Sequence, residues 1–451
     1  MARDCIIRGG MVVRSSGVAR LDVAIEDGRV SALAPEIGGG ARETIDATGL
    51  HVFPGVLDAH VHFNDPGRDA WEGVPTGSAA LVAGGGTCFI DMPLNSSPPT
   101  LTAASFDRKL EACQGRARAD FALWGGLTPD NLGDLEALAE RGVVGFKAFM
   151  SGSGIDDFRR CDDETLFRGM QIAARLGLPV AVHAENDGMT SALAAAARGA
   201  GRTSVRDYLE SRPISAEAEA ISRALAFAEE TGCALHVVHT SSARGVGLIR
   251  RAVEEGRSDA TCEVCPHYLF FTGDDMERLG ARAKCAPPLR SESERAALVR
   301  EVAAGRVDTI GSDHSPSPPS MKQAGDFFGA WGGVSGAQAT LRALITLGIP
   351  LEQIASRVSD NVSRRFRLPG KGGIRVDGDA DLALVDLSSR APVAEGELLD
   401  RHHLSPYVGQ PLAGSIHRTL LRGATVFRDG TLVGPPLGRF LRPPPIDSAG
   451  S

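Results

Sequence analysis

Two histidines separated by one residue end a short apolar run from Val56 to Phe63. Pro54-Gly55 precedes the run and Asn64-Asp65-Pro66-Gly67 follows it, so the pattern predicts a buried strand that ends in a loop. Successive side chains of a strand alternate between its faces, so His60 and His62 point the same way. Two imidazoles on one side of a strand can hold one metal ion. Such a pair also occurs in cores and on surfaces, so the spacing alone does not decide.

Strand and helix patterns alternate through the middle of the chain. Eight short apolar runs are predicted as strands, at 56–63, 87–92, 119–124, 143–149, 179–183, 234–239, 259–265 and 307–313. Helical periodicity between them is clearest at 163–176, 216–230, 291–304 and 335–347. The strand type and spacing predict a (β/α)8 TIM barrel. A doubly wound sheet is disfavoured because the chain has no Gly-x-Gly-x-x-Gly turn.

Polar side chains gather at the C-terminal ends of these predicted strands, where barrels of this kind place their chemistry. They are His60, His62, Lys147, His183, His239 and Asp313. Each one taken alone has an ordinary structural explanation, but together they predict a metal site. His236 lies deeper in its strand and is interpreted as structural. His267 and His314 follow strands and are candidates for orienting the ligands.

Lys147 needs a separate explanation, because an ammonium group cannot ligate a cation. Surrounding imidazoles and metal lower the pKa of the amine. A neutral amine can add carbon dioxide to become a carbamate, an anion able to bridge two metals about 3.5–4 Å apart. The sequence therefore predicts two divalent ions bridged by N6-carboxylated Lys147. Imidazole and oxygen ligands suit zinc, with cobalt or manganese as alternatives.

Both ends of the chain show the short alternating pattern of antiparallel strands. Gly9-Gly10 and Asp27-Gly28 are predicted as turns. We expect the two ends to form one small β-sandwich. The predicted division is a first part of it at 1–52, the catalytic barrel at 53–367, and a second part with the C-terminal tail at 368–451. The proline-rich tail from Gly434 is expected to be a covering strap or disordered.

Composition excludes several classes of protein. The 451 residues carry 48 basic and 56 acidic side chains, a net charge of −8 without a basic tract. This argues against nucleic acid or a membrane surface as a partner. No signal peptide or membrane span is predicted. The eight cysteines are scattered, which predicts reduced thiols and a cytoplasmic location. Cys262 and Cys265 are interpreted as two partly buried thiols and not as a zinc knuckle or redox pair.

Longer motifs make the analysis more specific. Pro-Gly-Val-Leu-Asp-Ala-His-Val-His-Phe-Asn-Asp-Pro-Gly-Arg stands at 54–68, Gly-Phe-Lys-Ala-Phe-Met at 145–150, Cys-Ala-Pro-Pro-Leu-Arg at 285–290 and Ala-Trp-Gly-Gly-Val-Ser at 330–335. With shorter runs at 71–73, 84–87, 91–96 and 312–316, they resemble the allantoinases, in the cyclic-amidase branch of the amidohydrolase superfamily. The resemblance covers essentially the whole chain.

The resemblance implies a mechanism and a set of roles. His60 and His62 would bind one metal together with Asp313, His183 and His239 would bind the second, and carboxylated Lys147 would bridge. A hydroxide would attack a ring amide carbon, and Asp313 would carry its proton to the leaving nitrogen. The implied reaction is the opening of allantoin to allantoate in purine degradation, by a homotetramer. Substrate contacts are expected from Asn95, Ser151, Ser153 and the backbone around Cys285, although Asn95 is equally well explained as a turn residue.

Three departures bear on the choice of substrate. Asn64 stands where dihydroorotases have an arginine for the substrate carboxylate. Hydantoinases and dihydropyrimidinases have a tyrosine shortly after the lysine, and this chain has none after Lys147. Ser317 stands where allantoinases usually have cysteine. A hydantoinase-type or dihydropyrimidinase-type cyclic amidase is therefore the alternative enzyme, and a non-catalytic scaffold is the alternative of a different class. The segment 316–328 is expected to be a mobile lid.

Overall fold

A computed structural model describes residues 3–444, and its centre is a barrel of parallel strands that matches the predicted (β/α)8 class. The strands are β6 (Val56–Val61), β7 (Gly86–Asp91), β8 (Asp120–Leu123) with β9 (Gly125–Gly126), β10 (Phe146–Phe149), β11 (Val180–His183), β12 (Leu235–Val237), β13 (Ala260–Val264) and β14 (Thr309–Ile310). All pair in parallel with their neighbours. All eight predicted strands are thus present.

Two places in the barrel need explanation. The third strand is interrupted at Trp124, so that β8 pairs with β7 while β9 pairs with β10. The first and last strands meet through a parallel bridge between Val61 and His314, where the backbone N–H of His62 donates to the carbonyl of His314 at 2.8 Å. These contacts close the ring of strands and bring the His-x-His segment beside the end of β14.

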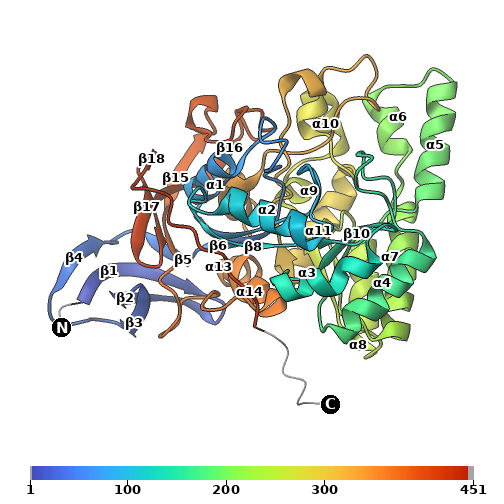
Figure 1. Cartoon of the computed structure of the whole chain (residues 1–451). Helices are drawn as coiled ribbons and strands as arrows, with labels where there is room; N and C mark the ends of the chain where they lie inside the picture. Colours follow the sequence, from blue (N-terminus) through green and yellow to red (C-terminus); the bar gives the residue numbers. More distant parts are fainter. Residues whose placement is uncertain (1–2, 445–451) are drawn as a thin grey trace.

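Helices and short helical turns connect the strands and cover the barrel (Figure 1). They are α1 (Val74–Ala83), α2 (Ala103–Cys113), η1 (Leu132–Asp134), α3 (Leu135–Arg141), α4 (Asp163–Arg175), α5 (Asp187–Gly199), α6 (Val205–Glu210), α7 (Ile214–Thr231), α8 (Ala243–Glu254), α9 (Pro266–Phe270), α10 (Gly273–Leu279), η2 (Gly280–Ala283), α11 (Glu292–Ala303), η3 (Pro319–Lys322), η4 (Ala337–Ala339), α12 (Thr340–Thr346), α13 (Leu351–Ala355), η5 (Ser356–Asp360), α14 (Asn361–Phe366) and η6 (Glu395–Glu397). The predicted helices at 163–176, 216–230 and 291–304 are confirmed. The one at 335–347 starts as a 3₁₀ turn. Side-chain caps fix several starts, as where Asp162 accepts from the Thr165 N–H.

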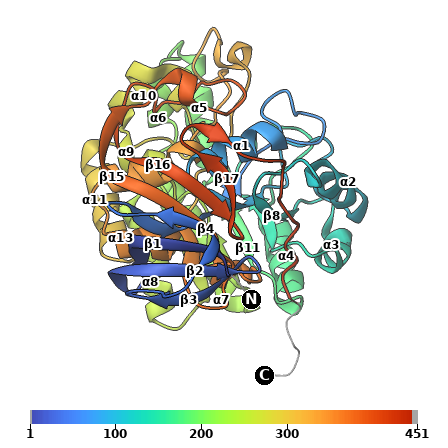
Figure 2. The ribbon, with the colours of Figure 1, turned by 90° about the vertical axis from the view of Figure 1, so that its left-hand side faces the viewer.

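The two ends of the chain form one β unit, as expected. Its nine-stranded sheet consists of β1 (Arg3–Arg14), β2 (Gly17–Glu26), β3 (Arg29–Ala34), β4 (Ala41–Asp46), β5 (His51–Pro54), β15 (Leu382–Pro392), β16 (Pro411–Leu421), β17 (Ala424–Arg428) and β18 (Thr431–Leu432). Strand β5 joins the halves, because it pairs with β1 on one side and β15 on the other. Figure 2 shows the blue and orange-red strands continuing one another. The division at 52/53 and 367/368 stays a prediction.

The two predicted turns in the first strands had different outcomes. Asp27-Gly28 is the turn between β2 and β3, with φ of 50° and 76°, which confirms the hairpin. The prediction of a turn at Gly9-Gly10 was wrong, because β1 runs through both glycines with a bulge. A Cβ on Gly10 would lie 2.7 Å from Val52 Cγ2, so glycine is needed where β5 approaches closely.

The C-terminal segment lies along the outside of the barrel. The Phe121 N–H donates to the Arg439 carbonyl at 2.9 Å, and the Leu441 N–H donates to the Phe121 carbonyl at 2.7 Å. The Phe440 ring packs against Phe106 at 5.8 Å. Residues 434–444 are therefore a covering strap, one of the two expected forms, and residues 445–451 lie outside the described chain.

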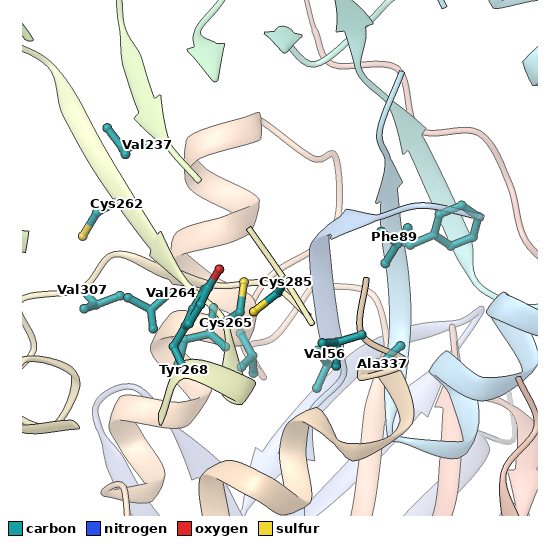
Figure 3. Close-up of a cluster of buried hydrophobic side chains, with 14 of the residues drawn as sticks. Val56, Phe89, Val237, Cys262, Val264, Cys265, Tyr268, Cys285, Val307 and Ala337 are labelled. Atoms are coloured by element: carbon teal, nitrogen blue, oxygen red, sulfur yellow. The ribbon is translucent and has the colours of Figure 1, made fainter. Parts of the chain in front are cut away.

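The main hydrophobic core surrounds the barrel strands on the side of the helices. Figure 3 shows part of it, where Val56, Phe89, Val264 and Tyr268 extend from β6, β7, β13 and α9. Inside the barrel, Trp124 is fully buried and its indole N–H donates to the Ala59 carbonyl at 3.0 Å. This dense packing holds the strand ends in fixed positions.

A buried charge cluster joins the barrel to the β unit at the end opposite the metal ligands. Lys371 Nζ lies 2.6 Å from Asp120 Oδ2, 2.9 Å from Asp379 Oδ2 and 2.7 Å from Asp381 Oδ2. Asp120 begins β8, whereas Asp379 and Asp381 directly precede β15. One ammonium group thus satisfies carboxylates from both units. Within residues 3–444, no helix combines the length and apolar character needed to cross a bilayer.

Candidate metal centre

The predicted ligands meet at the C-terminal mouth of the barrel. Side-chain atoms of His60, His62 and Asp313 all lie within 4.8 Å of one another. Asp313 Oδ1 is 3.3 Å from His60 Nε2 and 3.3 Å from His62 Nε2. Two ligands about 2.1 Å from one ion at a tetrahedral angle lie about 3.4 Å apart, so this spacing fits a shared cation.

A second pair of imidazoles faces the same mouth. His183 Nδ1 lies 3.1 Å from His239 Nε2, and both side chains are buried. The His183 ring stacks on Phe149 with centroids 4.7 Å apart, which fixes the plane of the imidazole. His60 and His239 approach to 5.4 Å between ring centroids, so the two groups of ligands are neighbours.

The backbone is strained at two of these positions. His239 has a φ of 38° and Asp313 a φ of 47°, in the left-handed region that residues with a Cβ seldom adopt. Such conformations cost about 1–3 kcal/mol each and cluster at functional sites. The two residues follow β12 and β14, and their side chains lie among the ligands at the mouth.

Two buried carboxylates orient the histidines, and sequence analysis missed both. Glu263 Oε1 lies 2.6 Å from His60 Nδ1, and Glu185 Oε2 lies 2.8 Å from His183 Nε2. Arg212 forms a bidentate ion pair with Glu185. A usable signal was present: Glu185 follows His183 by two residues, and Glu263 stands one residue before the end of β13, near the barrel mouth.

These carboxylates set the tautomers of the imidazoles. When Nδ1–H of His60 donates to Glu263, the lone pair is on Nε2, facing Asp313. When Nε2–H of His183 donates to Glu185, the lone pair is on Nδ1, facing His239. Lone pairs that converge on a carboxylate and on one another repel without a cation between them. The donor set therefore fits bound metal.

Lys147 has the properties expected of an amine that reacts with carbon dioxide. Its side chain is fully buried, and Nζ lies 4.0 Å from the centre of the Phe149 ring. Burial lowers the pKa of Lys147 to about 7, against the opposing effect of Asp313 and Glu263. The neutral amine, which is the form that reacts with carbon dioxide, is therefore accessible near neutral pH.

Asp58 lies beneath the ligands and joins the first and last strands. Its Oδ1 accepts from the backbone N–H of His60 at 3.2 Å and of Ser312 at 2.9 Å. Burial raises the pKa of Asp58 to about 6. The Asp58 carboxyl group thus joins the end of β6 to the segment after β14. It binds the backbone of the ligand His60 and of Ser312, the residue before the ligand Asp313.

The remaining histidines and cysteines have separate places. His267 lies beside Asp313, within the 4.8 Å group that also includes Cys265. His314 faces away from the ligands, accepting from the Ala337 N–H at 3.3 Å and lying 3.5 Å from Glu72. His236 contacts Thr261 Oγ1 at 2.8 Å, deeper in the barrel. All eight cysteines are free and buried, as expected.

A cleft of about 490 Å³ opens above the metal ligands. Asn95, Ser153 and Cys285 line it, together with Tyr208 and Arg212. The hydroxyl of Ser153 donates to the Phe158 carbonyl at 2.6 Å, which ties it to its own loop. Ser151 is buried and is not among the residues that line the cleft.

The residues 316–328 lie beside the cleft. Their middle forms η3, and Phe328 at their end lines the cleft with the next five residues. Tyr208 packs against this segment, with its ring centroid 5.8 Å from that of Phe328, and its OH donates to the Cys285 carbonyl at 2.9 Å. Mobility of 316–328 stays a prediction.

The chain has imidazoles and a carboxylate at the mouth of a (β/α)8 barrel, and a β unit built from both chain ends. Together these features are those of a metal-dependent hydrolase. The chain belongs to the amidohydrolase family, whose model matches residues 51–426. The match includes every predicted metal ligand and most of the β unit's second part.

Relatives match over nearly the full length. The allantoinase of Rubrobacter xylanophilus is 55% identical over 447 residues, covering 98% of each chain. The allantoinase of Solibacter usitatus is 54% identical, covering 98% of this chain and 97% of that protein. Among solved structures, L-hydantoinase (dihydropyrimidinase) from Arthrobacter aurescens superposes with a TM-score of 0.95 at 35% identity, covering 98% of this chain and 100% of that one. This structural similarity supports the barrel and the β-sandwich.

Proposed function

We propose that this protein hydrolyses the hydantoin ring amide of allantoin to give allantoate, as a step of purine degradation. The observation that carries this proposal is full-length identity of 51–55% to three allantoinases, from organisms as different as Rubrobacter and Deinococcus. The hydantoinase-type alternative has support from solved structures of hydantoinases and a dihydropyrimidinase, but these are only 29–35% identical to this chain. All six predicted metal-ligand positions carry residues that can bind metal, which argues against a non-catalytic scaffold.

The proposed cofactor is a pair of divalent metal ions, with zinc preferred and cobalt or manganese as alternatives. His60, His62 and Asp313 would hold one ion, His183 and His239 the other, and N6-carboxylated Lys147 would bridge them. When bound, the ions would polarise the amide carbonyl and acidify a water molecule. The support is the convergence of these donors and the lowered pKa of Lys147.

The protein's own groups supply the proton transfers. Asp313 Oδ1 lies 3.3 Å from both His60 Nε2 and His62 Nε2, at the centre of the ligand group. As a carboxylate it can accept a proton from the attacking water and deliver it to the leaving ring nitrogen. Asp313 also lines the cleft, where a substrate ring can reach it.

One position that would bind a substrate carboxylate is neutral in this chain. Asn64 stands where dihydroorotases have an arginine, so this position offers no cation to a carboxylate-bearing ring. Asn95, Ser153 and the backbone at Cys285 are proposed to bind the hydantoin ring, since all three line the cleft. Ser151 is buried and directly precedes Gly152 and Ser153, which line the cleft, so we propose that it supports these two residues.

The test is turnover of racemic allantoin by the metal-loaded enzyme, compared with hydantoin and dihydrouracil. We expect allantoin to be opened fastest. Faster opening of dihydrouracil would replace the proposal with the dihydropyrimidinase alternative. Absence of both bound metal and turnover would favour the scaffold.

Location and assembly belong to the same proposal. A cytoplasmic enzyme is supported by eight free, buried thiols. The family resemblance also leads us to propose a homotetramer. Light scattering would test this proposal through the mass of the protein in solution. The domain division at residues 52/53 and 367/368 is proposed with them.

A further inference from the structure

The chain has only five lysines, and each has a specialised environment. Lys109 pairs with Asp91 and Lys371 with three aspartates, while Lys147 faces the metal ligands. Lys284 and Lys322 differ from these, because backbone carbonyls of one loop take their hydrogen bonds. That loop, 327–333, contributes Phe328 to Gly333 to the wall of the cleft.

The loop itself has little regular structure to hold it. Residues 323–333 form neither helix nor strand, and three of the seven residues in 327–333 are glycines. Few of its carbonyls are satisfied by neighbouring strands, so they need other donors. Gly333 has a φ of 116°, and a Cβ there would lie 2.0 Å from the Ser315 carbonyl oxygen, so glycine is required at this turn.

The two lysines supply these donors from opposite ends of the loop. Lys284 Nζ donates to the carbonyls of Phe327 at 2.7 Å, Phe328 at 3.0 Å and Ala330 at 2.5 Å. Lys322 Nζ donates to the carbonyls of Trp331 at 3.2 Å and Gly333 at 2.7 Å. Five carbonyls of seven consecutive residues are thus held by two amines.

The protonation of each amine matches the number of its acceptors. Burial lowers the pKa of Lys284 to about 8, which leaves an ammonium with three donors at pH 7. The Tyr208 ring, 4.6 Å from Nζ, favours that charge. Burial and the neighbouring Lys284 lower the pKa of Lys322 to about 7, and even its neutral amine has two donors for two carbonyls.

The loop connects to the other loops at the mouth through Trp331. Its ring packs against Trp71 with centroids 5.0 Å apart, and a Cβ on Gly154 would lie 3.6 Å from the same ring. Trp71 and Gly154 belong to the loops after β6 and β10, which also carry an ion pair between Arg68 and Asp157 at 3.0 Å. The position of loop 327–333 therefore sets the width of the mouth.

We infer that Lys284 and Lys322 are positioning residues that clamp loop 327–333 as the wall of the substrate cleft and thereby determine affinity for the ring substrate. The inference rests on the proposed function for the identity of that substrate. Neither lysine is a metal ligand or a proton carrier, so the clamp acts on binding of the substrate and leaves the metal centre unchanged.

The test compares the metal-loaded wild type with Lys284→Met and Lys322→Met, and with Gln323→Met as a control that changes an exposed neighbour in the same segment. Methionine keeps the apolar stem but removes the donors. We expect Lys284→Met to raise KM for allantoin about tenfold and Lys322→Met about threefold, with kcat and metal content within about twofold of wild type. A fourth variant, Lys284→Arg, keeps the charge but cannot place three donors at one point, so it should not restore KM.

Hydrogen–deuterium exchange gives a measurement independent of activity. We expect the amides of 327–333 to exchange at least tenfold faster in both methionine variants, with the barrel strands unchanged. KM and exchange equal to those of Gln323→Met would overturn the clamp. If Lys284→Met does not fold, Lys322→Met alone decides by the same criteria. A wild type inactive on allantoin would overturn the proposed function, while the exchange comparison would still decide on the clamp.

Discussion

Replacing Glu185 by glutamine tests whether a buried carboxylate controls the metal-binding tautomer of His183. Glu185 is fully buried, with Oε2 2.8 Å from His183 Nε2 and Oε1 3.0 Å from Arg212 Nε. Burial opposes its ionisation, but Arg212 and His183 lower the pKa of Glu185 to about 2. A glutamine has one acceptor oxygen for these donors. Its amide N–H₂ would face either Arg212 or His183.

The expected loss follows from that geometry. Because the Arg212 guanidinium keeps the single oxygen, the amide donates to His183 Nε2, and the imidazole proton moves to Nδ1, the atom that faces His239. A charge-assisted hydrogen bond is worth about 1.5–3 kcal/mol. Loss of such a supporting partner typically weakens metal affinity about 10- to 100-fold. We expect a decrease of that size for Glu185→Gln.

The assay titrates the metal-free protein with zinc and follows both bound metal and turnover. Saturating metal should restore kcat to within a few-fold of wild type, since Glu185 does not reach the substrate. Glu164→Gln is the matched control, an exposed glutamate that pairs with Arg168 on α4. Equal zinc affinity in Glu185→Gln and this control would refute the tautomer argument.

Three further predictions address the bridge, its chemistry and the junction of the two units. Lys147→Ala should lose most of its bound metal, measured by metal analysis, and its kcat/KM should fall more than about 100-fold. Full metal content in this variant would contradict a bridging role. Activation of the metal-free enzyme by zinc and bicarbonate should become faster as pH rises through about 7 and then level off, because the neutral amine of Lys147 accumulates above its lowered pKa; a rate independent of pH between 6 and 8 would argue against it. Lys371→Met should lower the free energy of unfolding by about 3–5 kcal/mol, because it leaves buried Asp381 and half-buried Asp379 without their cation and Asp120 with Arg422 alone. Denaturant titration measures this loss, and a change below about 1 kcal/mol would show that Arg422 alone compensates Asp120.

The strand ends could be located from the sequence because their physical signal is local. Short apolar runs followed by turn residues mark buried strands, and a barrel brings their ends together whatever the distances along the chain. His60 and Asp313 are far apart in sequence yet 3.3 Å apart in space. The resemblance then added roles that spacing alone does not give.

The supporting residues were not found because their function depends on contacts between strands. Glu263 lies in the seventh predicted strand, 259–265. It reaches His60 only because β13 pairs with β14 and the segment after β14 meets β6, which closes the barrel. The glycines at 9 and 10 were misinterpreted for a related reason. The need for a small residue at Gly10 comes from Val52 of β5, which no local pattern reveals.

The central claim is a carbamate on Lys147 between two metal ions. The most direct measurement is ¹³C NMR of enzyme reconstituted with zinc and ¹³C-bicarbonate, combined with metal analysis of the same sample. We predict one carbamate signal and two metal ions per chain, with the signal absent from Lys147→Ala. An unmodified amine in fully active enzyme with bound metal would contradict the account.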